Sequence, residues 1–527
     1  MQFDFSKAKA IGLKQYIPAD RLVKPGQERQ GVWVVEPSYE ALSGWTIQGR
    51  PEHQPIELEM NFEETGWHHV FIRCDVAATA PEQVGILARF VDEPYYTPLQ
   101  IEQTELGFKD LHIGATDLRG KRLLICPVRA FSAFGVAEAA SPAVTLDCVR
   151  VISMSDAERD EYLRRRSSPA SKEVTGMFDS PPSYFPTDQE AASIVYNHAR
   201  AGFTKIYFRC FAVRCNNYWS KVEEIARIPG SERLNPPMLE RYDVLAAAVE
   251  AARKEGVELH GVMRMNNVAS KRSEGNRSPD TAFRKKHPDK VMLYRNGKPR
   301  NLLSYAWPEV RQHKIEIMKE IAGYGVHGIV IDSLRQPQTV LFDQPVVDAY
   351  LRETGRDPRT PEESVREEWL RFRADRTFTQ LLREMRAGLK RMGNFEFTVR
   401  TFLDPRQALQ TGCDVATWVK EGLIDTLIAA PCYMINQPAM LDIRPMRAVI
   451  GPNVKLIVKA WRMGSMAECE NLTAHVYDQG ADGVLLYQSD FLIARPYART
   501  HVWNLRHAET TRRLREALRS HTPRGAS

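Results

Sequence analysis

The sequence predicts an α/β fold, a (β/α)₈ TIM barrel that follows an N-terminal β-sandwich. Residues 30–152 contain short, closely spaced strand patterns and no long helical period, which is typical of a sandwich. From residue 187 onward, apolar strands alternate with amphipathic helices, which indicates parallel βα units. A doubly wound open sheet is the alternative, but the glycine-rich phosphate-binding turn expected after its first strand is absent.

Length and composition place the chain among multidomain globular proteins. Its 527 residues favour about two to three domains. A net charge of +6, with Lys and Arg spread along the chain, argues against a nucleic-acid partner. The sequence contains no run of about 18 apolar residues, so we expect no membrane span. No CxxC pair occurs among the 8 cysteines and no apolar leader opens the chain, so we expect free thiols and a cytoplasmic location; the sequence leaves the oligomeric state open.

Shifts in composition suggest the domain boundaries. We expect a β-sandwich over 1–163, a linker over 164–186, a catalytic barrel over 187–510 and a basic tail over 511–527. The linker is predicted from its Arg, Ser and Pro content, including Pro181 and Pro182. Three tryptophans of the sandwich are expected in its core rather than as sugar-stacking platforms, namely Trp33, Trp45 and Trp67.

The barrel elements follow in order after a capped helix that begins at Thr187. Strands are expected over 205–209, 257–263, 302–304, 328–332, 397–402, 426–430, 455–460 and 484–487. Helices are expected between them over 242–254, 308–322, 367–391, 415–421 and 466–479. Because active sites of such barrels lie at the carboxyl ends of the strands, those ends hold the candidate residues.

Asp332 is the sharpest candidate for catalysis. It ends an apolar strand, where an ionised carboxylate must be paired or must face a cleft. Glycoside hydrolysis requires two carboxyl groups, and we predict Asp490 and Asp404 as partners of Asp332. The alternative for Asp332 is a structural salt bridge with Arg335 or Arg400.

Other polar and aromatic residues at strand ends are expected to bind substrate. They are Arg209, Tyr218, Trp219, Arg264, Asn266, Arg335, Arg400, Tyr433, Lys459 and Trp461. Because guanidinium groups bind carboxylates well, this set predicts a negatively charged sugar such as a uronate. The alternative is that the arginines point outward or pair with helix carboxylates. The loop after residue 209 also contains Glu223 and Glu224 as further carboxylates.

Short motifs occur in a characteristic order between about residues 200 and 490. They are YDVLA at 242–246, ARKEGVELH at 252–260, HPD at 287–289, WPEVR at 307–311, HGIVID at 327–332 with Arg335 beyond it, and WVKEGLID at 418–425 with Pro431 and Tyr433. In this order they resemble the glycosyl-hydrolase-like family ten of TIM-barrel glycosidases. The resemblance implies a barrel glycosidase centred on Asp332. Two positions depart from the pattern, because His327 replaces the Asp of a DGI motif and Ser333 replaces a frequent second Asp.

We therefore expect a glycosidase that acts on a carbohydrate or glycoconjugate and needs no metal or organic cofactor. Two alternatives stay open. One is a non-catalytic barrel that binds carbohydrate. The other is a barrel lyase or isomerase that uses Lys459 as a base, which would require a desolvated lysine or one set beside other cations.

Overall fold

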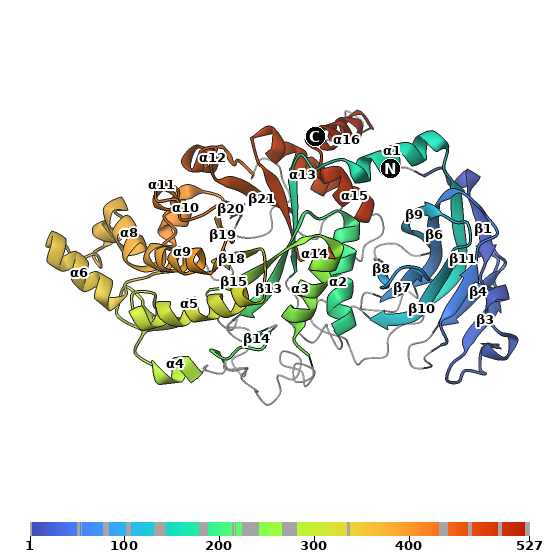
Figure 1. The fold of residues 1–527 in the computed structure, drawn as a ribbon, viewed down its shortest axis with the longest axis horizontal. Coiled ribbons are helices and arrows are strands. Elements are labelled where there is room, and N and C mark those ends of the chain that lie inside the picture. Colours follow the sequence, from blue (N-terminus) through green and yellow to red (C-terminus); the bar gives the residue numbers. More distant parts are fainter. Residues whose placement is uncertain are drawn as a thin grey trace. The chain divides into compact units, whose positions relative to one another are not determined.

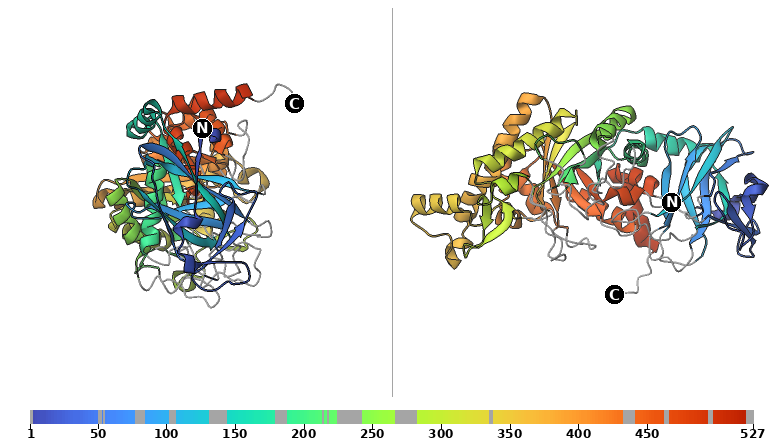
Figure 2. Two further views of the ribbon diagram at one scale, coloured as in Figure 1. Left: turned by 90° about the vertical axis from the view of Figure 1, so that its right-hand side faces the viewer. Right: turned by 90° about the horizontal axis from the view of Figure 1, so that it is seen from below.

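The computed structural model describes residues 3–49, 53, 55–76, 84–101, 107–130, 144–178, 188–212, 215–216, 218–223, 242–265, 282–334, 338–431, 441–461, 466–493 and 498–521. Its backbone divides into two compact units (Figures 1 and 2). Unit 1 comprises Met1–Pro169 with Tyr196–Gly202 and Asp490–Trp503, and unit 2 comprises Ala170–Val195, Phe203–Ser489 and Asn504–Ser527. Among the described helices, none is long and apolar enough to cross a membrane.

Unit 1 contains the predicted β-sandwich. One sheet has the order β2 (Leu22–Val23), β3 (Trp33–Pro37), β4 (Trp45–Gly49), β11 (Val144–Ser153), β6 (Trp67–Val76) and β9 (Lys109–Asp117), with β1 (Lys9–Gly12) also on β11. The other has the order β5 (Leu58–Asn61), β10 (Arg122–Ala130), β7 (Val84–Phe90) and β8 (Thr97–Ile101). Neighbouring strands are antiparallel except β2 and β3, as a sandwich requires.

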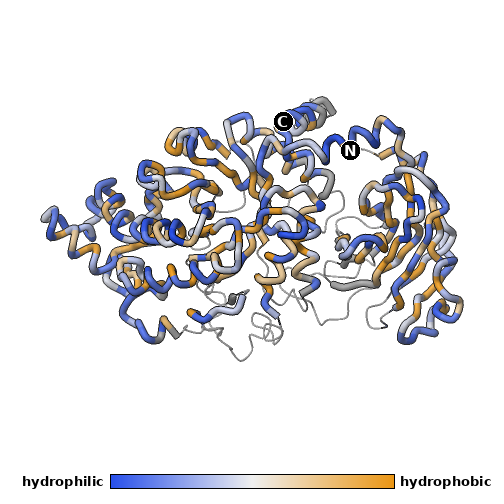
Figure 3. Tube along the Cα trace, in the orientation of Figure 1, coloured by the Kyte–Doolittle hydropathy of each residue, from blue (hydrophilic) through white to orange (hydrophobic). Residues whose placement is uncertain are grey.

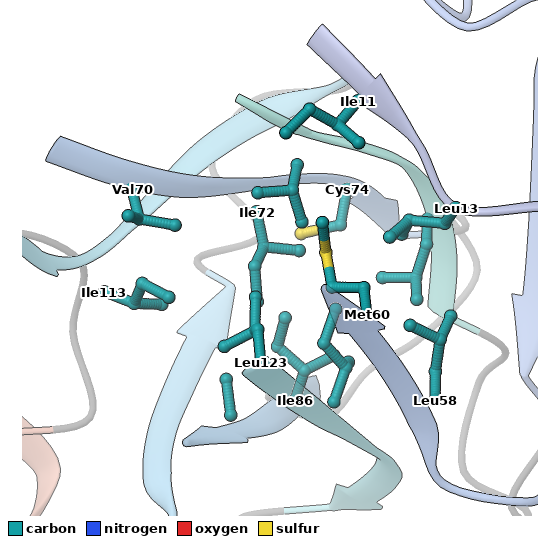
Figure 4. Close-up of a cluster of buried hydrophobic side chains, with 14 of the residues drawn as sticks. Ile11, Leu13, Leu58, Met60, Val70, Ile72, Cys74, Ile86, Ile113 and Leu123 are labelled. Atoms are coloured by element: carbon teal, nitrogen blue, oxygen red, sulfur yellow. The ribbon is translucent and has the colours of Figure 1, made fainter. Parts of the chain in front are cut away.

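The inner faces of these sheets form one apolar core. Figure 4 shows side chains from both sheets in this core, including Met60, Ile72 and Leu123. Trp33 is also buried there, and its indole N–H donates to the Ile56 carbonyl at 2.9 Å. The core placement predicted for this tryptophan is confirmed. Trp45 is only half-buried, and Lys14 lies over its ring.

Unit 2 contains the predicted barrel. Its strands are β12 (Glu173–Phe178), β13 (Lys205–Ala212), β15 (Glu258–Arg264), β18 (Gly328–Asp332), β19 (Glu396–Phe402), β20 (Thr426–Ala430), β21 (Lys455–Trp461) and β22 (Gly483–Tyr487). Within the described part of the chain, these eight strands are parallel, and pairing of β12 with both β22 and β13 closes the ring. A short antiparallel strand, β14 (Cys215–Asn216), pairs with the end of β13.

Helices connect and cover the barrel strands. Figure 3 shows mixed hydrophobic and hydrophilic residues along them, which suits helices that pack on one face. The described helices are α1 (Asp156–Ser167), α2 (Asp188–Ala201), α3 (Val244–Glu255), α4 (Ala282–Lys286), α5 (Pro308–Gly323), α6 (Gln344–Thr354), α7 (Pro361–Ser364), α8 (Glu367–Ala374), α9 (Gln380–Met392), α10 (Pro405–Gln410), α11 (Val415–Lys420), α12 (Arg444–Ile450), α13 (Met466–Asp478), α14 (Ser489–Ile493), α15 (Ala498–Leu505) and α16 (Ala508–His521). A π-helical segment, Asp375–Thr379, joins α8 to α9.

Two predicted barrel elements are wrong. The strand expected at 302–304 belongs to β17 (Pro299–Leu303), which pairs with β16 (Val291–Leu293) in a separate hairpin. The first barrel strand is instead β12, inside the expected linker over 164–186. Six residues of that segment therefore complete the barrel, and the barrel begins before residue 187.

Candidate active site

The upper interior layer of the barrel is formed by inward-facing residues near the carboxyl ends of the strands. Val262, Val330 and Ile428 are buried in the barrel core. Since side chains alternate along a strand, Arg264 and Asp332 face the same interior two residues later. Arg400 lies directly opposite both Asp332 and Ile428 on its neighbouring strands, so it also faces inward.

Asp332 lies between two arginines in this layer. Its side chain is 1% exposed, and Arg264 and Arg400 occupy the matching positions on β15 and β19. Arg400 Nη1 donates to Asp332 Oδ2 at 3.1 Å, and Arg264 Nε lies 3.7 Å from the same oxygen. The Leu334 N–H donates to Asp332 Oδ1 at 3.1 Å. The salt bridge with Arg400 named as an alternative is therefore present.

Tyr487, the last residue of β22, extends this network across the barrel. Arg264 Nη2 donates to Tyr487 Oη at 2.8 Å, although β12 and β13 separate their strands in the ring. The Arg400 guanidinium lies 4.8 Å from the centre of the Tyr487 ring, and Lys459 Nζ lies 5.1 Å from it. Tyr487 was not predicted from the sequence, because the polar residues considered at this strand end, Gln488 and Asp490, both follow the strand. Continuing the inward alternation from Leu485 would have found it.

The arginines predicted at the barrel mouth face inward rather than outward. Arg209, Arg264 and Arg400 are only 7%, 4% and 5% exposed. Arg209 follows the core residue Tyr207 by two positions, as Lys459 follows Ile457. The predicted binding residues Asn266, Arg335 and Tyr433 lie outside the described residues. Trp461 ends β21, and only its backbone is described.

Tyr218 does not line the barrel mouth. Its side chain is fully buried, its hydroxyl donates to Glu320 of α5 at 3.2 Å, and its ring packs edge-on against Tyr324. Tyr218 as a substrate-binding residue is therefore wrong, because packing on a covering helix encloses it. The adjacent Trp219 is 51% exposed, and its backbone N–H donates to Asp243 at 3.0 Å.

The predicted partner carboxylates have different surroundings. Asp404 is exposed and caps α10, because its Oδ1 accepts from the Gln407 N–H at 2.8 Å. Capping is a structural role. Asp490 is half-buried in the first turn of α14 and belongs to unit 1, whereas Asp332 belongs to unit 2. Glu223 is buried against His313 at 2.5 Å.

One group in the described part of the chain has the spacing of metal ligands, at the opposite end of the barrel. The ligand atoms of Glu258, His260 and Glu396 lie within 4.8 Å of one another. Lys205 Nζ already lies 2.6 Å from Glu396 and 3.6 Å from Glu258. Since an ammonium neutralises these carboxylates, the group forms an ion-pair network at the strand starts.

Solved structures of carbohydrate-active enzymes resemble the chain distantly. The catalytic domain of a beta-amylase from Paenibacillus polymyxa is 10% identical, with a TM-score of 0.45, and covers 63% of this chain and 97% of its own. A GH36 alpha-galactosidase from Geobacillus stearothermophilus is 11% identical, with a TM-score of 0.38, over 90% of this chain and 64% of its own. A GH26-CBM35 beta-(1,4)-mannanase from Podospora anserina is 10% identical, with a TM-score of 0.29, over 97% and 96%.

Sequence comparison identifies the family. No curated protein matches the chain. The family model described as glycosyl hydrolase-like 10 matches residues 195–442. This stretch includes β13, β15, β18, β19 and β20, and with them Asp332 and the three inward-facing arginines. Residues 195–442 are thus a glycosyl hydrolase-like 10 region, which confirms the family that the ordered motifs resemble.

Proposed function

We propose that the protein is a glycoside hydrolase that cleaves an O-glycosidic bond in a carbohydrate or glycoconjugate, with Asp332 as a reacting carboxylate. The observation that carries the proposal is the buried Asp332 carboxylate at the carboxyl end of β18, facing the barrel interior. Barrel enzymes place their reacting groups at this end. The family match over 195–442 supports the same reaction class.

The contacts of Asp332 favour one of the two carboxylate roles in glycoside hydrolysis. One carboxyl group protonates the leaving oxygen, and the other, ionised, attacks the anomeric carbon or activates water. Asp332 contacts the cations Arg400 and Arg264, and we assign it the role of the carboxylate that attacks the anomeric carbon or activates water. Asp490 stays a predicted partner carboxylate, whereas Asp404 is engaged at the start of α10.

A barrel that binds carbohydrate without cleaving it is the second candidate. The observation that favours it is the capping role of Asp404, which leaves Asp332 one predicted partner fewer. A lysine-based lyase or isomerase has weaker support. Lys459 Nζ lies over the ring of Tyr487, and such a contact is typical of a bound cation rather than of a catalytic base.

Hydrolysis of a glycoside panel by the full chain, Asp332→Asn and Asp404→Asn tests the proposal. Asp332→Asn should lower kcat by at least about 1000-fold, because it removes the reacting charge but keeps the side-chain shape. Asp404→Asn is the matched control and should keep kcat within about threefold, since Asn also caps helices. Binding of a glycoside without cleavage by the wild type would support the second candidate. Cleavage that survives in Asp332→Asn would overturn the assignment of Asp332.

A further inference from the structure

We propose that the barrel mouth contains a subsite for the carboxylate of an acidic sugar, and that Arg400 is the main residue that binds this carboxylate. This inference rests on the proposed function for the identity of the ligand as a sugar. Three features carry it: the charge of the upper interior layer, an unused edge of the Arg400 guanidinium, and the fixed position of that guanidinium.

The upper interior layer is rich in positive charge. Its described residues include four cations, Arg209, Arg264, Arg400 and Lys459, and the carboxylate Asp332. All three arginines are more than nine-tenths buried. Like charges repel strongly where the local dielectric is low. A carboxylate placed at Arg400 would gain a charge-assisted contact in this low-dielectric setting, whereas a neutral ester would not.

Arg400 offers the geometry that a carboxylate requires. Its Nη1 holds Asp332 at 3.1 Å and lies 3.9 Å from Met177 Sδ. Its Nε is buried and has no hydrogen-bond partner in the part of the chain that the structure describes. The edge formed by Nε and Nη2 is one of the two edges at which a guanidinium binds both oxygens of a carboxylate.

Exposed arginines of this chain use that same edge for carboxylates. Arg444 donates from Nε and Nη2 to the two oxygens of Asp442 at 2.8 and 2.9 Å. Arg359 binds Asp357 in the same way at 2.9 and 3.0 Å. The corresponding edge of Arg400 carries no such bond within the described residues, although Arg400 is far more deeply buried.

The guanidinium of Arg400 is held in position before any ligand arrives. Asp332 fixes one of its nitrogens, and its plane lies 4.8 Å from the centre of the Tyr487 ring. Tyr487 also contacts Lys459 and Arg264, so three cations converge on one aromatic side chain. Such preorganisation reduces the entropy lost on binding.

Binding of paired sugars to the full chain tests the subsite. The probes are D-glucuronate, D-galacturonate and N-acetylneuraminate. The affinity of each acid is compared with that of its own methyl ester, and binding is measured by calorimetry and by thermal shift. At least one acid should bind at least tenfold more tightly than its ester. Arg400→Lys keeps the charge but removes the two-nitrogen edge, and should reduce that preference at least tenfold. Arg444→Lys is the matched control on an exposed arginine and should leave the preference unchanged.

The outcomes separate this inference from the proposed function. If no acid binds more tightly than its ester in the wild type, the subsite is wrong, whether or not the variants fold. A preference that persists in Arg400→Lys also overturns the role of Arg400. Acid-selective binding with no cleavage of any glycoside would contradict the proposed hydrolase function and support the subsite. Cleavage of neutral glycosides without a preference for acids would support the hydrolase function and contradict the subsite.

Discussion

The two ends of the barrel interior are built from similar residues but in different balance. At the strand starts, Lys205 is surrounded by Glu173, Glu258 and Glu396, and Lys455 also contacts Glu173. At the strand ends, arginines and Lys459 outnumber Asp332. The charged residues at the strand starts form the lower layer, and those at the strand ends form the upper layer.

We interpret this difference as one between charges that stabilise the barrel and charges that we propose to act on a ligand. Each cation of the lower layer has a carboxylate within ion-pair distance. Burial alone would lower the pKa of Lys205, but Glu173 and Glu396 raise it above its usual value. Gly328 lets the residues of this layer pack closely, because a Cβ there would lie 2.5 Å from His260 Nδ1 and 2.6 Å from the Glu396 carbonyl oxygen. An end whose charges pair with one another suits a structural role, and an end where a buried guanidinium has an unused edge suits a ligand.

The largest expected effect comes from removing a barrel strand. A fragment 187–527 lacks β12, which pairs with both β13 and β22, so the ring would open and expose two strand edges. We expect this fragment to be insoluble or to melt without cooperativity. The fragment 170–527 retains β12 and is the control. Equal solubility and equally sharp thermal transitions would show that β12 is dispensable for the barrel.

Lys205→Met should destabilise the lower layer next most strongly. The substitution leaves Glu173, Glu258 and Glu396 close together without their shared cation, which should cost about 3–5 kcal/mol of unfolding free energy. Lys455→Met is the control, because Lys455 is half-exposed and an exposed pair contributes at most about 1 kcal/mol. Urea denaturation measures both. Similar losses would contradict a layer organised around Lys205.

Acid should affect the sandwich before it affects the lower layer. Burial lowers the pKa of His69 to about 4, below its usual 6.5. The unfolded chain therefore binds a proton that the folded sandwich resists, and stability falls between about pH 6.5 and 4, by roughly 3 kcal/mol. A hydrogen bond with His260 lowers the pKa of Glu258 to about 2, so the stability it adds is present above pH 4.5 and is lost as pH falls toward 2.

Acid unfolding followed by hydrogen exchange can separate these two windows. Loss of protection in β6 should begin above pH 4, whereas β15 should keep its protection until lower pH. His69→Phe should remove the first window and leave the second. Simultaneous loss in both strands, unaltered by His69→Phe, would show that His69 does not control the response.

Tyr487→Phe should have the smallest effect and should act on function. It removes the acceptor of the Arg264 hydrogen bond but keeps the ring under Arg400 and Lys459. We expect kcat/KM to fall about 10-fold, with a stability loss near 1 kcal/mol. A change in stability with no change in kcat/KM would assign Tyr487 to packing alone.

Local patterns predict the barrel well where strands are apolar and regularly spaced. The ranges predicted for β18, β20 and β22 differ from the structure by at most one residue at either end. β12 was missed because it lies within a segment rich in Arg, Ser and Pro. The 302–304 strand was misplaced because periodicity does not reveal which partner a strand pairs with, and β17 pairs with β16.

In the candidate site too, local patterns predict the residues on strands but not the contacts with distant parts of the chain. Arg264 and Asp332 could be predicted because each ends an apolar strand, and Arg400 because it lies two residues before the end of another; alternation places all three inward. Tyr218 could not be placed, because its burial depends on Glu320, which is 102 residues away. The capping role of Asp404 was open to prediction, since Asp before Pro405 is a typical helix start.

The most direct test compares the two layers through one matched pair of variants, Asp332→Asn and Glu396→Gln. Each replaces a carboxylate that pairs with a cation by its neutral amide, at 3.1 Å from Arg400 for Asp332 and at 2.6 Å from Lys205 for Glu396. Both should lower the unfolding free energy by about 1–3 kcal/mol. For folded protein on the same glycoside, kcat should fall at least about 1000-fold in Asp332→Asn and stay within about threefold in Glu396→Gln. Equal losses of activity in both variants would contradict the division into a functional and a structural end.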